Sequence, residues 1–447
     1  MVKRVAAITL GCAKNQVDTE YMLGMLPKSD YVIVSEPEDA DAVVINTCCF
    51  IDEAKKETID TLLQLVREKR KNPGLKLIAA GCLVQKYVQE LFSEIPEIDG
   101  LMGTGQVDGL AAALEHVFAH AKERYVSVKD QGRATSDFGE RRLITTAGPT
   151  SYLKIAEGCN NRCTYCVIPQ IRGPYRSREI EALVSEAEQL VEAGAKEICL
   201  VAQDVTAYGL DLYGRLELPT LLKRLAVIDD LHWIRLLYCY PTNITRELIQ
   251  VIQAEEKICK YLDIPLQHGD DGVLKRMGRK GNRLYLERLV NELRSSLPGV
   301  VLRTTFIVGF PGETEEEFQN LLDFMEKNRF HWAGAFTYSQ EPGTPAEKMG
   351  DQVSPEIKEK RYHQLMLLQR EITSQENEKW LGKIVPVMVE RRPEGKDGLY
   401  QGRTEFQGPE VDGLVHFYAQ ADLCPGDFVQ VKVLQVMEYD LVGEMVP

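Results

Sequence analysis

The 447-residue sequence has no long apolar run, since no stretch approaches the ~20 consecutive apolar residues that span a bilayer. Its first residues, MVKRVAAITLGCAKN, hold too short an apolar run for a signal peptide, so we expect a cytoplasmic protein without a membrane partner. Positive charge is also in deficit, because 53 Lys and Arg stand against 67 Asp and Glu, a net charge of −14. Proteins held to nucleic acid by phosphate contacts are basic at least locally, which makes nucleic acid the less expected direct substrate.

The sequence also lacks the cysteine pattern of a disulfide framework, although it contains eleven cysteines. Their number is odd, their spacing is not that of a small secreted scaffold, and cytoplasmic chains seldom keep disulfides. Metal or catalytic chemistry is therefore the expected use of some of them. The composition, 44% hydrophobic and 27% charged, is that of a globular protein, and the length allows about three domains.

Residues 1–145 alternate short apolar runs with helical patterns, which predicts βαβ units and a parallel sheet. Strands are expected over residues 5–10, 42–45 and 77–80, and each is followed at once by a cysteine: Cys12, Cys48 and Cys82. Ligands of open α/β sheets bind beyond the carboxyl ends of the strands, so these three cysteines can converge. The alternative, that they are small buried residues, is weaker for three cysteines at equivalent positions.

The expected fold class is α/β, and the residues after the first domain predict a partial barrel followed by a small β domain. After a polar, turn-rich linker over 125–150, the strand–helix unit recurs about six times, with strands expected at 152–156, 197–202, 233–237, 261–264, 301–308 and 332–338. A closed (β/α)8 barrel needs eight units, so an open (β/α)6 barrel fits better. Residues 354–380 predict a connecting helix and 381–447 a small antiparallel OB-like β-barrel, which gives expected domains at 1–145, 146–380 and 381–447.

The strongest local signal is the segment EGCNNRCTYC, which places Cys159, Cys163 and Cys166 within eight residues directly after a strand. A structural zinc site usually takes four protein ligands, and the nearest histidine lies tens of residues away. Iron–sulfur cubanes are also normally held by four thiolates. A cubane on three cysteines leaves one iron open to a substrate or cofactor.

This spacing resembles the cysteine loop of radical S-adenosylmethionine (SAM) enzymes, whose partial barrel matches the one expected above. The resemblance implies a 4Fe–4S cluster that binds SAM at its open iron. It also implies SAM contacts at Tyr165, at Gln203 and Asp204 after the second strand, and at Gly309 and Gly312 in the turn after the fifth. Other roles stay open: packing for Tyr165, a helix cap for Asp204, and an ordinary strand–helix turn for the glycines.

The six cysteines together resemble the layout of the methylthiotransferases over essentially the whole chain. The resemblance implies two 4Fe–4S clusters, an auxiliary one on Cys12, Cys48 and Cys82 and a SAM-binding one on Cys159, Cys163 and Cys166. It implies that an electron cleaves SAM to a radical that takes hydrogen from the substrate, after which sulfur and a methyl group are added. An electron donor and a sulfur source are implied partners. The adjacent Cys49 could compete with Cys48, and the other four cysteines are expected to be packing residues: Cys199, Cys239, Cys259 and Cys424.

Within this family the chain resembles the RimO branch, which methylthiolates an aspartate β-carbon on small-subunit ribosomal protein twelve, more than the branch that modifies a tRNA adenosine. The similarity lies in residues 168–178, 202–213 and 265–268, whereas Pro342 leans toward the tRNA type. The β domain at 381–447, which resembles a TRAM domain, has six cations and eleven anions, a net charge of −5 that suits a basic ribosomal protein. We expect it to recognise the substrate without doing chemistry, so SAM cleavage should persist without it. A non-catalytic iron–sulfur or zinc scaffold is the alternative from another class.

Overall fold

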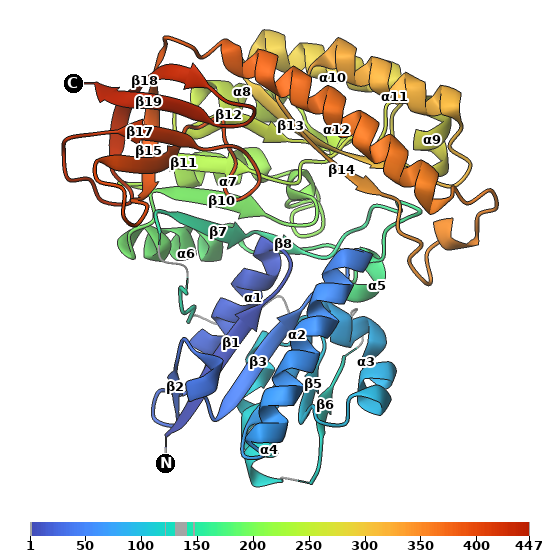
Figure 1. The fold of residues 1–447 in the computed structure, drawn as a ribbon, viewed down its shortest axis with the longest axis vertical. Helices are drawn as coiled ribbons and strands as arrows, with labels where there is room; N and C mark the ends of the chain where they lie inside the picture. The colour runs from blue at the N-terminus through green and yellow to red at the C-terminus, as the bar shows by residue number, and fades with distance from the viewer. Residues whose placement is uncertain (1, 121, 130–140, 146–147, 447) are drawn as a thin grey trace. The chain divides into compact units, whose positions relative to one another are not determined.

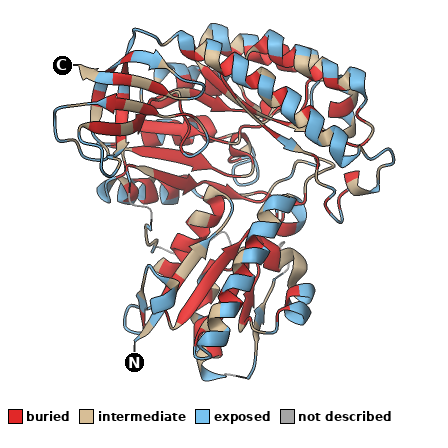
Figure 2. Ribbon diagram, viewed as in Figure 1, coloured by how far each residue is buried: buried red, intermediate tan, exposed pale blue. Residues whose placement is uncertain are grey.

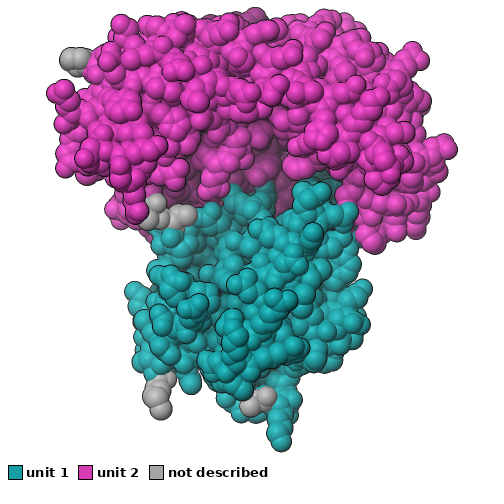
Figure 3. Space-filling model, in the orientation of Figure 1, with its two compact units in different colours: residues 1–147, 156–161, 166–178 teal, residues 148–155, 162–165, 179–447 magenta. Residues whose placement is uncertain are grey.

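The structure, a computed structural model, describes residues 2–120, 122–129, 141–145 and 148–446. It forms two compact units, shown in Figure 3: unit 1 holds residues 1–147, 156–161 and 166–178, and unit 2 holds the remainder. Half of the predicted linker over 125–150, at 130–140 and 146–147, lies outside the described residues. Within the described ranges, every helix is either too short or too polar to cross a bilayer.

Unit 1 is built on a parallel sheet in the order β2-β1-β3-β4-β5-β6. Its strands are β1 (Lys3–Thr9), β2 (Tyr31–Ile33), β3 (Ala42–Thr47), β4 (Lys76–Gly81), β5 (Gly100–Met102) and β6 (Tyr125–Ser127). β3 is buried along its whole length, as expected for a strand with helices on both faces of its sheet. The predicted strands β1, β3 and β4 are confirmed, whereas the short strands β2, β5 and β6 were not predicted.

The helices of unit 1 are α1 (Ala13–Gly24), α2 (Asp52–Lys71), α3 (Cys82–Glu94), α4 (Leu110–Ala119) and α5 (Ile168–Arg172). Helix α2 is amphipathic, because Leu62, Leu65 and Val66 face the core while its remaining positions are largely charged. A two-stranded ribbon of β8 (Ala156–Glu157) and β9 (Arg176–Ser177) also belongs to this unit. The chain therefore returns to unit 1 after its first strand in unit 2.

Unit 2 contains a second parallel sheet in the order β14-β13-β12-β11-β10-β7, which is the predicted open, six-stranded partial barrel. Figure 1 shows these strands, and Figure 2 shows that all of them except the edge strand β14 are buried along most of their length. They are β7 (Thr150–Lys154), β10 (Glu197–Val201), β11 (Trp233–Leu236), β12 (Ile258–Asp263), β13 (Val301–Val308) and β14 (Trp332–Thr337). All six lie at the predicted positions, to within a few residues at their ends.

Helices follow the strands of this sheet: α6 (Ile180–Glu192), α7 (Leu218–Ala226), α8 (Arg246–Ala254), α9 (Asp271–Arg276), α10 (Arg283–Ser296), α11 (Glu315–Asn328) and α12 (Pro355–Glu378). Helix α11 begins with a complete capping box, in which Thr314 and Glu317 each bond the other's backbone N–H. Helix α12 begins at Pro355 after the cap Ser354, which confirms the expected connecting helix.

The chain ends in a closed barrel of β15 (Ile384–Arg391), β16 (Leu399–Arg403), β17 (Val415–Tyr418), β19 (Leu441–Val446) and β18 (Phe428–Val436). Alternate residues of the strands point inward, so Val385, Val387 and Val389 meet Val429 and Val431 in one apolar core. The pairings are antiparallel, as expected, except that β17 and β19 run parallel.

A buried ion-pair network joins this barrel to the parallel sheet of unit 2. Glu197 at the start of β10 receives bonds from Arg235 of β11, at 2.6 Å, and from Arg403 of β16. The side chains of all three residues are fully buried. Arg403 also pairs with Glu390, and Arg235 donates to the backbone oxygen of Glu405 at 2.8 Å. The closed β-barrel is therefore joined to the parallel sheet of unit 2 through buried side chains.

Candidate metal centres

Three predicted cysteines follow neighbouring strands of the unit 1 sheet. Cys12 comes after β1, Cys48 after β3 and Cys82 after β4, and these strands are adjacent in that order. The strand order reverses between β1 and β3, and open α/β sheets bind ligands at such a switch point beyond the carboxyl ends. The cysteines thus occupy the position where this topology places a ligand.

The three thiols lie within electrostatic reach of one another. The charge of Cys12 raises the pKa of both Cys48 and Cys82, and that of Cys48 also raises the pKa of Cys82. Burial is the largest cause for both residues and brings the pKa of Cys82 to about 12. At Cys12, burial alone would raise the pKa, but the charges of Lys14 and Arg172 together with backbone N–H donors lower it. Cys12 caps α1 and Cys82 begins α3, so two helix dipoles favour thiolates at these positions.

Two glycines allow the cysteines to approach this closely. Gly11 has φ +90°, and a Cβ there would lie 2.6 Å from the Cβ and 2.7 Å from the Sγ of Cys48. Gly81 has φ +98°, and its Cβ would lie 2.3 Å from Asn46 Oδ1. Any other residue before Cys12 or Cys82 would meet both a disfavoured backbone conformation and a steric clash.

Replacing Gly81 by alanine is therefore expected to damage the site. We expect the free energy of unfolding to fall by about 1–3 kcal/mol, the cost of a non-glycine residue in such a conformation. Less than half of the parent's iron should remain on Cys12, Cys48 and Cys82. Denaturant unfolding and iron analysis after anaerobic reconstitution measure both quantities. Gly74→Ala in the same unit is the control, since Gly74 is exposed and has no close neighbour except the Asn72 side chain at 3.4 Å. Parent-like stability and iron content in Gly81→Ala would contradict this account.

A buried arginine contacts this cysteine set. Arg172, at the end of α5, is 2% exposed. Its Nη1 donates to Asp18 Oδ2 and to both carboxylate oxygens of Glu157, each at 3.0 Å. Its Nη2 donates to Asn15 Oδ1 and to Cys82 Sγ, the latter at 3.4 Å. Residues 168–178 stood out in the sequence only for their resemblance, and no pattern there revealed this role.

The second cysteine set is divided between the two units, since Cys159 and Cys166 belong to unit 1 and Cys163 belongs to unit 2. Cys159 follows Gly158, which has φ +81°, and its Sγ accepts from Asn161 N at 3.4 Å. Cys163 Sγ accepts from Arg279 Nη1 at 3.8 Å. All three cysteines are partly exposed.

Among the described residues, no three His, Cys, Asp or Glu side chains are close enough to hold a single metal ion. The cysteines of a cubane each bind a different iron, so they stand farther apart than the ligands of one ion. All-thiol donor sets of three, one of them at a sheet switch point, fit iron–sulfur clusters by their chemistry.

One of the predicted SAM contacts, Tyr165, packs against an apolar cluster of unit 2 whose buried members include Met277, Phe310 and Tyr338. Phe310 lies in the turn between Gly309 and Gly312, two further predicted contacts. Gly309 and Gly312 have φ +71° and +72°, and a Cβ on Gly309 would lie 2.3 Å from Lys358 Cγ.

The predicted contacts after β10 lie three strands away from β13 in the same sheet. Asp204 caps the 3-10 turn Val205–Ala207 by accepting from Thr206 N at 3.1 Å. Asn243 Nδ2 also donates to its other oxygen at 3.3 Å. Asp204 therefore fills the cap role that the sequence left open, and its SAM contact and that of Gln203 stay predictions.

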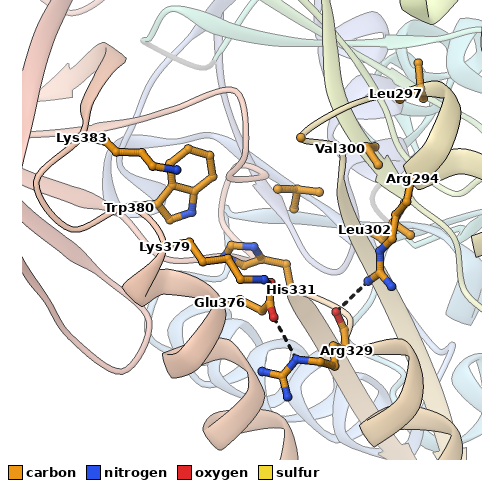
Figure 4. Close-up of a pocket in the computed structure, with 12 residues that line it drawn as sticks. Arg294, Leu297, Val300, Leu302, Arg329, His331, Glu376, Lys379, Trp380 and Lys383 are labelled. Carbon is orange, nitrogen blue, oxygen red and sulfur yellow. Dashed lines mark hydrogen bonds and ion pairs between the residues drawn. The ribbon is translucent and has the colours of Figure 1, made fainter. Parts of the chain in front are cut away.

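A pocket of about 460 Å³ lies elsewhere in unit 2 (Figure 4). It is lined by residues that precede β13 and β14 and by the end of α12, among them Val300, His331 and Glu376. This is the amino end of the strands, whereas the predicted SAM contacts after β10 and β13 lie at the carboxyl ends. None of the predicted site residues lines it.

The remaining cysteines mostly pack in cores. Cys199, Cys239 and Cys259 are buried, which supports their expected packing role, and Cys49, the possible competitor of Cys48, is buried as well. Cys424 is exposed, so its expected packing role is wrong. It lies in the turn before β18, where its backbone N–H donates to Asp427.

Three segments of the chain match known families. Residues 4–103 match the uncharacterized protein family UPF0004, residues 153–325 the radical SAM superfamily and residues 381–446 the TRAM domain. The radical SAM match implies a 4Fe–4S cluster and SAM as cofactors.

Among solved structures, the fold is similar to that of the radical SAM methyltransferase TsrM from Kitasatospora setae, with a TM-score of 0.55, 15% identity and 77% of each chain covered. It is also similar to the cobalamin-dependent SAM radical enzyme OxsB, with a TM-score of 0.51 and 12% identity over 83% of this chain and 56% of that one. These likenesses, together with the two parallel sheets and the closed barrel, confirm the predicted α/β fold class.

Curated relatives match over nearly the full length. The chain is 47% identical over 441 residues to the ribosomal protein uS12 methylthiotransferase RimO of Desulforamulus reducens, 48% over 443 to that of Pelotomaculum thermopropionicum and 50% over 444 to that of Moorella thermoacetica. In each case 99% of both chains is covered. Identity at this level over the complete length shows that the chain belongs to the family of ribosomal protein uS12 methylthiotransferases RimO.

Proposed function

We propose that this chain is a radical SAM methylthiotransferase that replaces a C–H bond on the β-carbon of an aspartate of ribosomal protein uS12 by a C–SCH3 bond. The observation that carries the proposal is the full-length identity of 47–50% to curated enzymes of that name. The proposed substrate places the reaction in the cytoplasm, where ribosomes are found.

We propose two 4Fe–4S clusters, one held by Cys12, Cys48 and Cys82 and one by Cys159, Cys163 and Cys166. When bound, the clusters and SAM supply the electron, the radical, the sulfur and the methyl group, none of which side chains can provide. An electron donor and a sulfur source must serve the chain. The support for a second cluster is the placement of Cys12, Cys48 and Cys82 at the switch point of the unit 1 sheet.

The chain's own residues bind and orient these groups. The thiolates hold the clusters, and only three for each leave one iron of each open. The aromatic cluster of Tyr165, Phe310 and Tyr338 offers an apolar wall beside the Gly309–Gly312 turn. We propose that this wall and turn flank SAM, because glycines let a backbone approach a ligand closely.

The test is mass spectrometry of ribosomal protein uS12 and of tRNA from cells that lack this chain. We expect the uS12 peptide to lose the mass of one methylthio group while methylthio-adenosine in tRNA is unchanged. Restoring the gene should restore the peptide mass, and a gene with Cys163→Ala should not. Loss of the tRNA modification with an unchanged uS12 peptide would reverse the choice of substrate.

A further inference from the structure

The structure places a buried guanidinium against a cysteine of the auxiliary set, and the proposed function gives that contact no role. We propose that Arg172 is a positioning residue that sets the reduction potential of the cluster on Cys12, Cys48 and Cys82 by donating a charged hydrogen bond to Cys82. The inference rests on the proposed second cluster.

The first support is how the guanidinium divides its contacts. Nη1 faces the two carboxylates, Asp18 and Glu157, at 3.0 Å each, and this alone neutralises the buried positive charge. Nη2 turns away from the carboxylates to Asn15 Oδ1 and to Cys82 Sγ at 3.4 Å. One nitrogen therefore anchors the side chain, and the other is directed at a thiol.

The second support is that the anchors come from elements that already hold the cysteines. Asp18 and Asn15 lie on α1, which Cys12 caps, and Asn15 Nδ2 donates to Leu10 O at 2.8 Å and to Thr47 O at 3.0 Å. Leu10 and Thr47 are close neighbours in sequence of Cys12 and Cys48. Arg172 thus bonds to a scaffold tied to all three cysteine segments, which fixes its distance from the cluster.

The chemistry gives the sign of the effect. Adding an electron makes the cluster and its thiolates more negative, and a nearby cation that donates to a ligand sulfur stabilises that state. Burial strengthens the interaction, because Arg172 is only 2% exposed and water screens it little. Losing the cation should therefore lower the potential and make the cluster harder to reduce.

The experiment uses a full-length chain in which Cys159, Cys163 and Cys166 are alanine, so that only the auxiliary cluster reports. In this background, Arg172→Gln is expected to bind parent-like iron but to shift the EPR-monitored reduction midpoint downward, by at least the 59 mV that corresponds to a tenfold change in the one-electron equilibrium. Arg172→Lys keeps the charge and should shift it less.

Asp18→Asn is the matched control, since it removes a negative charge from the same guanidinium and leaves the bond to Cys82. Its midpoint should stay or move upward, whereas general damage to the site would move both variants the same way. Arg279→Gln in the same alanine background should leave the midpoint of the auxiliary cluster unchanged, because the cysteine that Arg279 contacts is Cys163.

The outcomes separate this inference from the proposed function. If the alanine background binds no cluster while the parent binds one, the second cluster is wrong. If the cluster assembles and Arg172→Gln keeps the parent midpoint, Arg172 is only structural and the inference is wrong. If Arg172→Gln does not fold, the other two variants decide: Arg172→Lys must lower the midpoint while Asp18→Asn does not lower it, and any other result would overturn the inference.

Discussion

Cys163→Ala is expected to reduce SAM cleavage to the level seen without enzyme, whereas Cys48→Ala should cleave SAM within a few-fold of the parent rate and transfer no sulfur. The reason is that the two cysteines belong to different proposed clusters, and only the one on Cys159, Cys163 and Cys166 binds SAM. Release of 5′-deoxyadenosine measures cleavage, and the mass of the uS12 peptide measures transfer.

Cys49→Ala provides the control for this pair of variants. Cys49 is adjacent to Cys48 but packs fully buried in the apolar core of unit 1, so its loss should leave the iron content and both activities near those of the parent. If Cys49→Ala loses the iron and Cys48→Ala keeps it, the ligand has been assigned to the wrong neighbour. If Cys48→Ala assembles the SAM cluster yet cleaves no SAM, the division of labour is wrong.

The second large effect is expected on stability, from Arg403→Met. This substitution leaves Glu197 buried with one of its two arginine partners gone, and breaking a buried pair in this way costs about 3–5 kcal/mol. Denaturant unfolding measures the loss. The control is Arg392→Met in the same β-barrel, where the exposed pair with Asp397 should contribute no more than about 1 kcal/mol. Equal losses in the two variants would show that the buried network is not what holds the β-barrel in place.

The buried ion pairs of Glu197 with Arg235 and Arg403 also predict how the free energy of unfolding depends on pH. Burial alone would raise the pKa of Glu197, but Arg235 and Arg403 outweigh it and hold the pKa at about 2, below the ordinary 4.5. Glu197 therefore contributes stability above about pH 4.5, and this contribution is lost as the pH falls toward 2. The contribution should shrink in Arg403→Met, so its unfolding free energy should depend less on pH in this window.

This network corrects the expectation that SAM cleavage persists without residues 381–447. Removing them deletes Arg403, one of the two arginines that hold the Glu197 carboxylate, and Glu405, whose backbone oxygen accepts from Arg235. We now expect such a truncated chain to be unstable, so truncation cannot isolate substrate recognition. Substitutions at exposed positions of the β-barrel can do so.

The charge argument for the β-barrel also needs revision. Its sequence has six cations and eleven anions, but Glu405 and Asp412 face Lys260 and Arg303 of the parallel sheet, and Arg403 is fully buried. On the described surface, five exposed cations remain against seven exposed anions: Glu394, Glu410, Glu438, Glu444, Asp397, Asp422 and Asp427. Recognition of a basic ribosomal protein by the β-barrel stays a proposal, and its electrostatic support is weaker than the net charge of −5 implies.

The parts that the sequence predicted well depend on local patterns. Cys12, Cys48 and Cys82 could be found because each follows an apolar run of strand length, and parallel strands bring their ends to one edge. Strands of three residues, such as β2 and β5, carry too short a pattern to be recognised.

Arg172 could not be predicted, because its partners Asn15 and Cys82 lie 157 and 90 residues away in the sequence. The pairing of Arg403 with Glu197 spans 206 residues for the same reason. Only tertiary structure brings these residues together. Asp204 illustrates another limit, because the same position after a strand suits both a ligand contact and a cap.

Because the chain returns to unit 1 after β7, the gene segment for residues 1–147 does not encode a complete folding unit. Val167 and Ile171 belong to the apolar core of unit 1, and Glu157 and Arg172 complete its buried polar cluster. A gene fragment that stops before residue 148 would encode a sheet with a missing core segment and with Asp18 left without its guanidinium. The first 147 residues are therefore not a module that recombination could pass to another barrel unaltered. The segment that begins at Cys166 is needed to complete unit 1, so the loop of Cys159, Cys163 and Cys166 should be inherited together with the first 147 residues.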